Sequence, residues 1–191
     1  MPFYIDTLLA RDQGRQLATG VLWESFHPQI VGSQTAPTTQ HVYGVLGYLY
    51  AGDVVKGVVL RNGTAAAAAN PTTARFGIAQ PTSQSAATIL ALSGNENLAA
   101  SWPLGANPHP FTTPYIVTSS GPYYACFVVN GVWGTPPTPI RGTGSANAMG
   151  PLGTNYPVNF EWAGQTDLPA VGSPVTTTAY ISVGYYMGFY Y

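Results

Sequence analysis

Short β-prone runs, separated by turn residues at close intervals, most strongly constrain what this chain can fold into. From residue 21 onward, aromatic and β-branched runs alternate with connectors that hold most of the 17 prolines and 22 glycines. This spacing is typical of sandwiches and barrels built only from strands. We therefore predict an all-β fold: a jelly-roll-like antiparallel β-sandwich over residues 21–191, of about eight strands, with a short N-terminal arm.

The clearest runs are separated by recognisable turn signals. We predict strands over 41–50, 54–61, 73–80, 87–92, 111–118, 123–129, 156–162 and 178–191. The pairs Asn62-Gly63 and Asn130-Gly131 each follow an apolar run, and both predict hairpins because Asn and Gly tolerate positive φ. The proline-rich segments 105–110 and 134–139 indicate connectors. The alanine run 65–69 is predicted to be a loop or a single turn, because Asn70-Pro71 ends it at once.

Residues 1–20 differ from the remainder of the chain. This segment holds four of the thirteen charged residues, and its apolar side chains are Leu8, Leu9 and Leu17. It could form a short helix with Asp6 or Thr7 as N-cap, or an extended arm that pairs with a neighbouring subunit. We favour the arm, since one or two helical turns are marginal alone. The three leucines are then the candidate anchor residues, because they have too few apolar neighbours for a core of their own.

Charge is unusually scarce in this chain. Only 7% of residues are Asp, Glu, Lys or Arg, against about 25% in an average soluble protein. A surface with little electrostatic self-repulsion associates readily, which is typical of stable assemblies and outward-facing adhesive modules. The net charge is −1, and the six cations are not clustered, so no nucleic-acid partner is expected. No apolar stretch is long enough for a membrane span, and the first residues lead us to expect no secretory signal.

Side chains capable of catalysis or metal binding are few and scattered. Glu161 and Asp167 are the only close carboxylate pair outside the arm, and Asp167 lies in an expected turn where Asp caps its own backbone. His27, His41 and His109 are isolated, without the spacing of a metal site. Cys126, the only cysteine, alternates with apolar residues on a strong strand and is expected to be a buried small hydrophobe. We expect no catalytic residue, no cofactor and no metal.

The last predicted strand has two distinct faces. Under strict alternation, one face carries the core side chains Ile181, Val183, Tyr185, Met187, Phe189 and Tyr191. The other alternates tyrosine with small residues, and Tyr180, Tyr186 and Tyr190 are its candidate interface or adhesion residues. Tyrosines on a solvent-facing strand suit a subunit interface or a sugar. The alternative is that loops of the same subunit cover these rings.

The C-terminal half carries a recognisable series of motifs. Tyr123-Tyr124-Ala125-Cys126-Phe127-Val128-Val129-Asn130-Gly131 is followed by Thr135-Pro136-Pro137, Arg141-Gly142, Leu168-Pro169 and Ala179-Tyr180-Ile181-Ser182-Val183-Gly184. This series resembles the C-terminal β-sandwich domain of minor tail and other structural virion proteins of actinobacterial phages. The resemblance covers roughly residues 21–188. The chain departs from the family pattern at Val132-Trp133-Gly134, which lengthens the Asn-Gly loop, and at 185–191, beyond the usual end.

The resemblance implies a function outside enzymology. It predicts a phage virion structural protein, made in the host cytoplasm, that forms a tail or tail-tip component with a role in host adhesion. The expected partners are further copies of the chain, as a homo-oligomer and most simply a trimer, other virion proteins through residues 1–20, and a glycan of the host cell surface. A capsid-surface decoration protein and a carbohydrate-binding module are the alternatives.

Overall fold

A computed structural model describes residues 21–24, 31–65, 67–97, 102–143, 156–157, 159–177 and 183–191. In these ranges the regular structure consists of strands. They are β1 (Val21–Glu24), β2 (Val31–Gln34), β3 (His41–Leu49), β4 (Val54–Asn62), β5 (Ala67–Ser83), β6 (Ala86–Leu92), β7 (Gly105–Ile116), β8 (Gly121–Thr135), β9 (Ile140–Thr143), β10 (Asn159–Ala163), β11 (Pro174–Thr176), β12 (Val183–Tyr185) and β13 (Met187–Tyr190).

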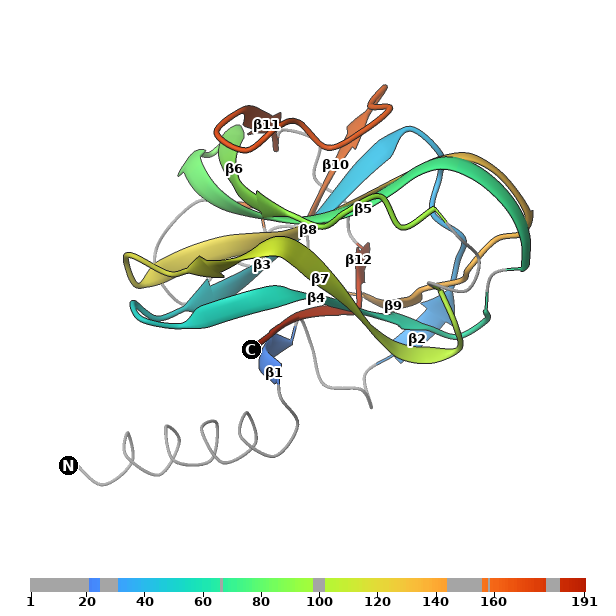
Figure 1. Cartoon of the computed structure of the whole chain (residues 1–191), viewed down its shortest axis with the longest axis horizontal. Helices are drawn as coiled ribbons and strands as arrows, with labels where there is room; N and C mark the ends of the chain where they lie inside the picture. The colour runs from blue at the N-terminus through green and yellow to red at the C-terminus, as the bar shows by residue number, and fades with distance from the viewer. Residues whose placement is uncertain are drawn as a thin grey trace.

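Two antiparallel sheets face each other and form a sandwich (Figure 1). The smaller sheet has the order β1-β13-β4-β7, and the larger sheet has the order β10-β3-β8-β5-β6-β11. The eight strands β1, β3, β4, β5, β6, β7, β8 and β13 follow the jelly-roll order, in which most connections cross from one sheet to the other. β12, β9 and β2 make a third, small sheet. The predicted fold class is confirmed.

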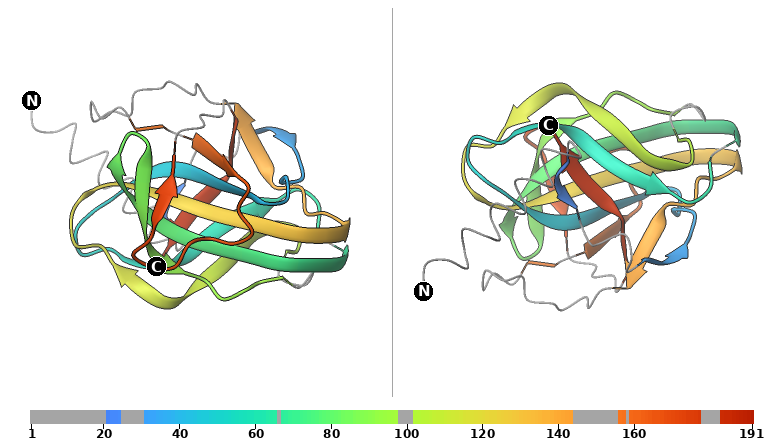
Figure 2. Two further views of the ribbon diagram at one scale, coloured as in Figure 1. Left: turned by 90° about the horizontal axis from the view of Figure 1, so that it is seen from above. Right: turned by 90° about the horizontal axis from the view of Figure 1, so that it is seen from below.

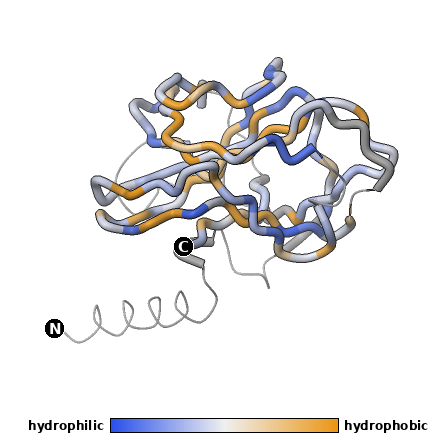
Figure 3. The backbone as a smooth tube through the Cα atoms, in the orientation of Figure 1, coloured by the Kyte–Doolittle hydropathy of each residue, from blue (hydrophilic) through white to orange (hydrophobic). Residues whose placement is uncertain are grey.

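Aromatic rings fill the space between the two sheets. Phe127 of β8 lies at their centre, 5.3 Å from the ring centroid of Tyr43, 5.9 Å from Phe76 and 5.1 Å from Tyr185. All four side chains are buried, as are Val58 and the other inward residues of β4. Apolar residues run along the strands of both layers in Figure 3. Burial of this apolar surface is the main force that holds the layers together.

The larger sheet is buried on its outer face as well. Alternate residues of β3 and β8, among them Val42, Tyr124 and Cys126, belong to a second cluster that includes Phe160 of β10 and Val175 of β11. This double burial explains why 123–129 is continuously apolar: one set of side chains faces each core. In both views of Figure 2, β5 and β8 run side by side through the length of the domain. Cys126 is fully buried, as expected, and burial raises the pKa of its thiol far above the usual value.

The segment 105–110, predicted to be a connector, is instead the first half of β7. Its side chains alternate, with Asn107 and His109 buried and Pro108 and Pro110 exposed. Proline cannot donate a ladder hydrogen bond, but β7 is the last strand of its sheet, and an edge strand tolerates that loss. The turn prediction was wrong because the prolines lie on the solvent face of an edge strand.

Neither Asn-Gly pair forms the predicted hairpin. Asn62 ends β4, and the chain then crosses to β5 in the other sheet. Asn130 and Gly131 lie inside β8, opposite a break in the register between Pro71 and Thr73 of β5. Gly131 does have a positive φ of 108°, so the pair marks an irregularity in the ladder and not a chain reversal. Ala67–Ala69, predicted to be a loop or turn, belong to β5.

Candidate binding surfaces

A groove lies between β6 and β7, where the edges of the two sheets meet. It has a volume of about 440 Å³. Leu90 and Leu92 of β6 and Tyr115 of β7 contribute half-buried apolar side chains to it, while Thr112 and Thr113 contribute exposed hydroxyls. An isolated bridge between Ser93 and Phe111 joins the two strands at this edge. The groove therefore combines apolar side chains with polar groups in a concave surface, as ligand sites generally do.

Arg75 of β5 and Val171 of the β10–β11 connection also line the groove. The Arg75 Nε lies 3.1 Å from Asp167 Oδ1, and the same carboxylate oxygen accepts a 2.7 Å hydrogen bond from the Leu168 amide. Asp167 thus caps its own turn, as the sequence predicted, and the turn holds the carboxylate beside the guanidinium. The contact places a carboxylate beside the Arg75 guanidinium at the groove.

A second candidate surface, at the end of the sandwich, carries three exposed apolar side chains. Tyr50 is 51% exposed, and Val54 and Ile116, which are paired across β4 and β7, are 41% and 62% exposed. Two backbone hydrogen bonds tie the β3–β4 turn to the β7–β8 turn: Gly52 N to Val117 O at 2.8 Å, and Val117 N to Asp53 O at 2.9 Å. We call this surface, Tyr50 with Val54 and Ile116, the apolar tip.

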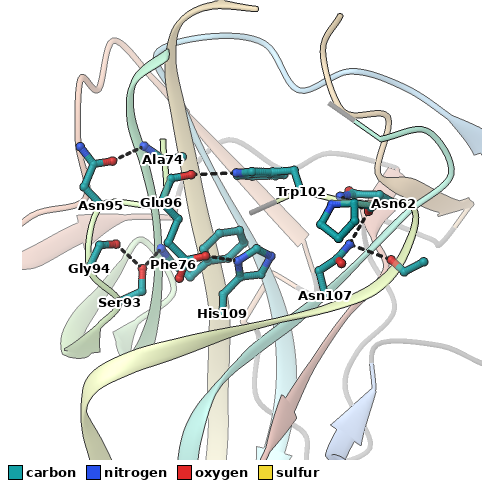
Figure 4. A network of polar contacts seen from close by, with 12 residues as sticks. Asn62, Ala74, Phe76, Ser93, Gly94, Asn95, Glu96, Trp102, Asn107 and His109 are labelled. Atoms are coloured by element: carbon teal, nitrogen blue, oxygen red, sulfur yellow. Dashed lines mark hydrogen bonds and ion pairs between the residues drawn. The ribbon is translucent and has the colours of Figure 1, made fainter. Parts of the chain in front are cut away.

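A polar network is buried between the sheets, near the connection between β6 and β7 (Figure 4). His109 is fully buried and stacks on Phe76, with ring centroids 3.6 Å apart and an interplanar angle of 9°. Its Nδ1 lies 2.5 Å from Glu96 Oε2, and the Glu96 carbonyl accepts a 2.9 Å hydrogen bond from Trp102 Nε1. The Ser93 hydroxyl accepts a 2.9 Å bond from the Phe76 amide. These bonds hold the connection against the core, so we assign the network a structural role.

Burial lowers the pKa of His109 below its usual value near 6.5, and the Glu96 carboxylate opposes part of this effect. His109 is therefore neutral in the folded protein at neutral pH, and its Nδ1–H donates a hydrogen bond to the Glu96 carboxylate. The unfolded chain takes up a proton at a higher pH than the folded protein, so stability is full above about pH 6.5 and decreases as the pH falls below it. Urea denaturation from pH 7.5 to 5 should show this decrease. His109→Gln, which keeps a donor for Glu96, should weaken the dependence; an unchanged slope would contradict the assignment.

The two carboxylates weighed as a catalytic pair are each engaged elsewhere. Glu161 of β10 contacts the Nδ1 of His41 on the adjacent strand β3, and these residues are two register positions apart. Asp167 is held by Arg75 and the Leu168 amide. The contact between Glu161 and His41 helps to join β10 to β3. The contact between Asp167 and Arg75 helps to hold the turn beside the groove.

The tyrosines predicted to face outward are placed differently from one another. Tyr186 is buried, at 3% exposure, which contradicts the expected outward position. The alternation breaks there because the chain changes sheets: the Tyr186 amide bonds to Ile140 O, and its carbonyl accepts from the Arg61 amide. Tyr190 is half-buried and covers Gly57, where an added Cβ would lie 2.7 Å from its ring. Tyr180, with Leu8, Leu9 and Leu17, lies outside the described residues.

The residues that line the groove were not identified from the sequence. They come from β5, β6, β7 and the β10–β11 connection, and only the sandwich topology brings these four segments together. Arg75 stands out in retrospect as the one charged residue within its apolar run, 73–80. No comparable signal singles out Thr112, Thr113 or Tyr115.

No protein-family model matches the chain, and no curated protein matches it. Within the described ranges, no three His, Cys, Asp or Glu side chains gather as they would around a metal ion. The same part of the chain contains no helix long and apolar enough to cross a membrane.

Proposed function

We propose that this chain is a phage virion structural protein, exposed on the particle as a tail or tail-tip component with a role in host adhesion. The observation that carries the proposal is a jelly-roll sandwich in a chain with only 7% charged residues. The jelly roll is a recurrent architecture of viral capsid proteins and lectins, and scarce charge suits a surface that enters assemblies. The motif resemblance to actinobacterial phage tail domains supports the same class.

The proposed partners are further copies of the chain, most simply as a trimer, and other virion proteins bound through residues 1–20. The apolar tip supports self-association, because exposed Tyr50, Val54 and Ile116 would lose contact with water in an interface. Tyr186 no longer belongs to the proposed interface, since its own subunit buries it. Light scattering that gives only the 20.1 kDa of one chain would contradict the oligomer.

Capsid-surface decoration is the second candidate. The eight-strand jelly-roll order favours it, because that order is itself a capsid architecture. The two candidates differ in where the protein lies on the particle, so one experiment separates them.

Gold-labelled antibodies against the purified protein, applied to intact virions of the phage that encodes it, test both candidates. We expect gold at the tail or tail tip in electron micrographs. Gold spread over the capsid would support decoration and overturn the tail assignment. Mass spectrometry of purified virions that detects the other structural proteins but not this chain would overturn both.

A further inference from the structure

We propose that the groove between β6 and β7 binds an uncharged saccharide of one or two sugar units. The inference deepens the proposed adhesion role and rests on it for its biological meaning, although its test uses purified protein alone. The groove volume, about 440 Å³, is within the usual range of small-molecule sites. It is too small to enclose a long oligosaccharide.

The apolar side chains of the groove suit the C–H face of a sugar ring. Tyr115 is half-buried, so its ring is held in place and yet presents a surface to the groove. The ring centroids of Tyr115 and Tyr123 are 6.3 Å apart, and Tyr123 is fully buried in the core. Leu90 and Leu92 extend the apolar area beside it. An amphipathic ring of this kind gives contact area at a low cost in side-chain entropy.

Hydrogen-bonding groups beside this apolar area remain available to a ligand. Thr112 and Thr113 are exposed, and neither hydroxyl bonds to another described residue. The terminal nitrogens of Arg75 likewise have no hydrogen bond within the described part of the chain; its contact with Asp167 is through Nε. Hydroxyls that donate and accept, together with a guanidinium that only donates, match the mixed hydroxyl groups of a sugar.

Charge favours a neutral ligand. Asp167 already balances Arg75 at 3.1 Å, and the Leu168 amide holds that carboxylate in place. A ligand carboxylate at the terminal nitrogens of Arg75 would meet Asp167 as a nearby like charge, which disfavours an anionic ligand. An uncharged sugar can bond to the free nitrogens of Arg75 without disturbing the pair.

The edge of β6 leaves little room for a peptide strand instead. Ile89 already exchanges hydrogen bonds with the β10–β11 connection, Ile89 N to Ser173 O at 3.0 Å and Gly172 N to Ile89 O at 2.8 Å. At the other end, Ser93 is bridged to Phe111. Only residues 90–92 lie between these contacts, which is too short for recognition by strand addition.

Saturation-transfer NMR on the full chain tests the proposal with the methyl glycosides of glucose, galactose, mannose and N-acetylglucosamine, and with glucuronic acid as the anionic comparison. We expect at least one neutral glycoside to bind at millimolar concentration. Val171→Trp should block the groove and weaken binding at least about tenfold, which corresponds to 1.4 kcal/mol. Val132→Trp is the matched control, because Val132 lies outside the groove. Its side chain is 74% exposed, and that of Val171 is 60% exposed.

A second pair of variants tests the hydroxyl contact. Thr113→Val keeps the shape of the side chain and should weaken binding about threefold, while Thr118→Val, at another exposed threonine, should not. Binding of glucuronic acid alone would overturn the neutral class, and equal binding by both tryptophan variants would overturn the site. No binding by any neutral glycoside would overturn the inference but leave the virion assignment intact, since the particle labelling decides that separately.

Discussion

Replacing Phe127 with alanine is expected to lower the free energy of unfolding by roughly 3–5 kcal/mol. Its ring is fully buried at the centre of the main core, in contact with Tyr43, Phe76 and Tyr185, so truncation leaves a cavity that rigid neighbouring rings cannot fill. A domain of this size has only about 5–15 kcal/mol of stability in total. Urea denaturation followed by tyrosine and tryptophan fluorescence measures the loss.

Two further variants separate the cavity effect from other causes. Phe127→Leu retains most of the apolar volume and should cost clearly less than the alanine variant. Val132→Ala lies on the same strand but is 74% exposed, so it should change stability by less than about 0.5 kcal/mol. A loss at Val132→Ala as large as that at Phe127→Ala would show that the core is not centred where the structure places it.

Glu96→Ala should destabilise the protein by roughly 2–3 kcal/mol at neutral pH. The substitution removes the acceptor of the His109 Nδ1 proton, and His109 is fully buried, so water cannot replace the lost partner without opening the core. The carbonyl of residue 96 would still accept from Trp102, so the effect reports on the side chain alone. Thermal and urea denaturation both measure it.

Glu96→Gln is the matched control, because its amide oxygen can still accept a hydrogen bond from the Nδ1–H of His109. It should therefore retain at least half of the stability that the alanine variant loses. If the alanine and glutamine variants were equally stable, the contact with His109 would contribute nothing, and the structural role of the network would be wrong.

Local sequence patterns predicted the strands whose side chains alternate or are apolar throughout. β3, β4, β6 and the first part of β8 follow the expected ranges closely, because burial on one or both faces leaves a direct trace in residue type. The crossing of the chain between sheets leaves no such trace. Asn62-Gly63 looks identical whether the next strand pairs with β4 or lies in the opposite layer, and the structure shows the latter.

The groove and the position of Tyr186 depend on tertiary structure to a greater degree. Strict alternation places Tyr186 on the outer face, but a switch between sheets at that residue turns its side chain inward. Arg75, Leu90, Tyr115 and Val171 are distant in the sequence and become neighbours only through the jelly-roll order. Composition establishes that the chain is poor in charge, and the associating surface inferred from it stays a prediction.

The two-sided burial of β8 also has a cost during folding. β3 pairs with β8 and β1 with β13, so strands from opposite parts of the chain must meet before either layer is complete. Such non-local topologies fold slowly, in milliseconds to seconds, because loop-closure entropy is lost before contacts form. Until then 123–129, an uncharged β-prone segment without proline, is uncovered on both faces and able to pair with other chains. The continuous apolar strand that stabilises the folded protein is thus also an aggregation hazard while the chain folds.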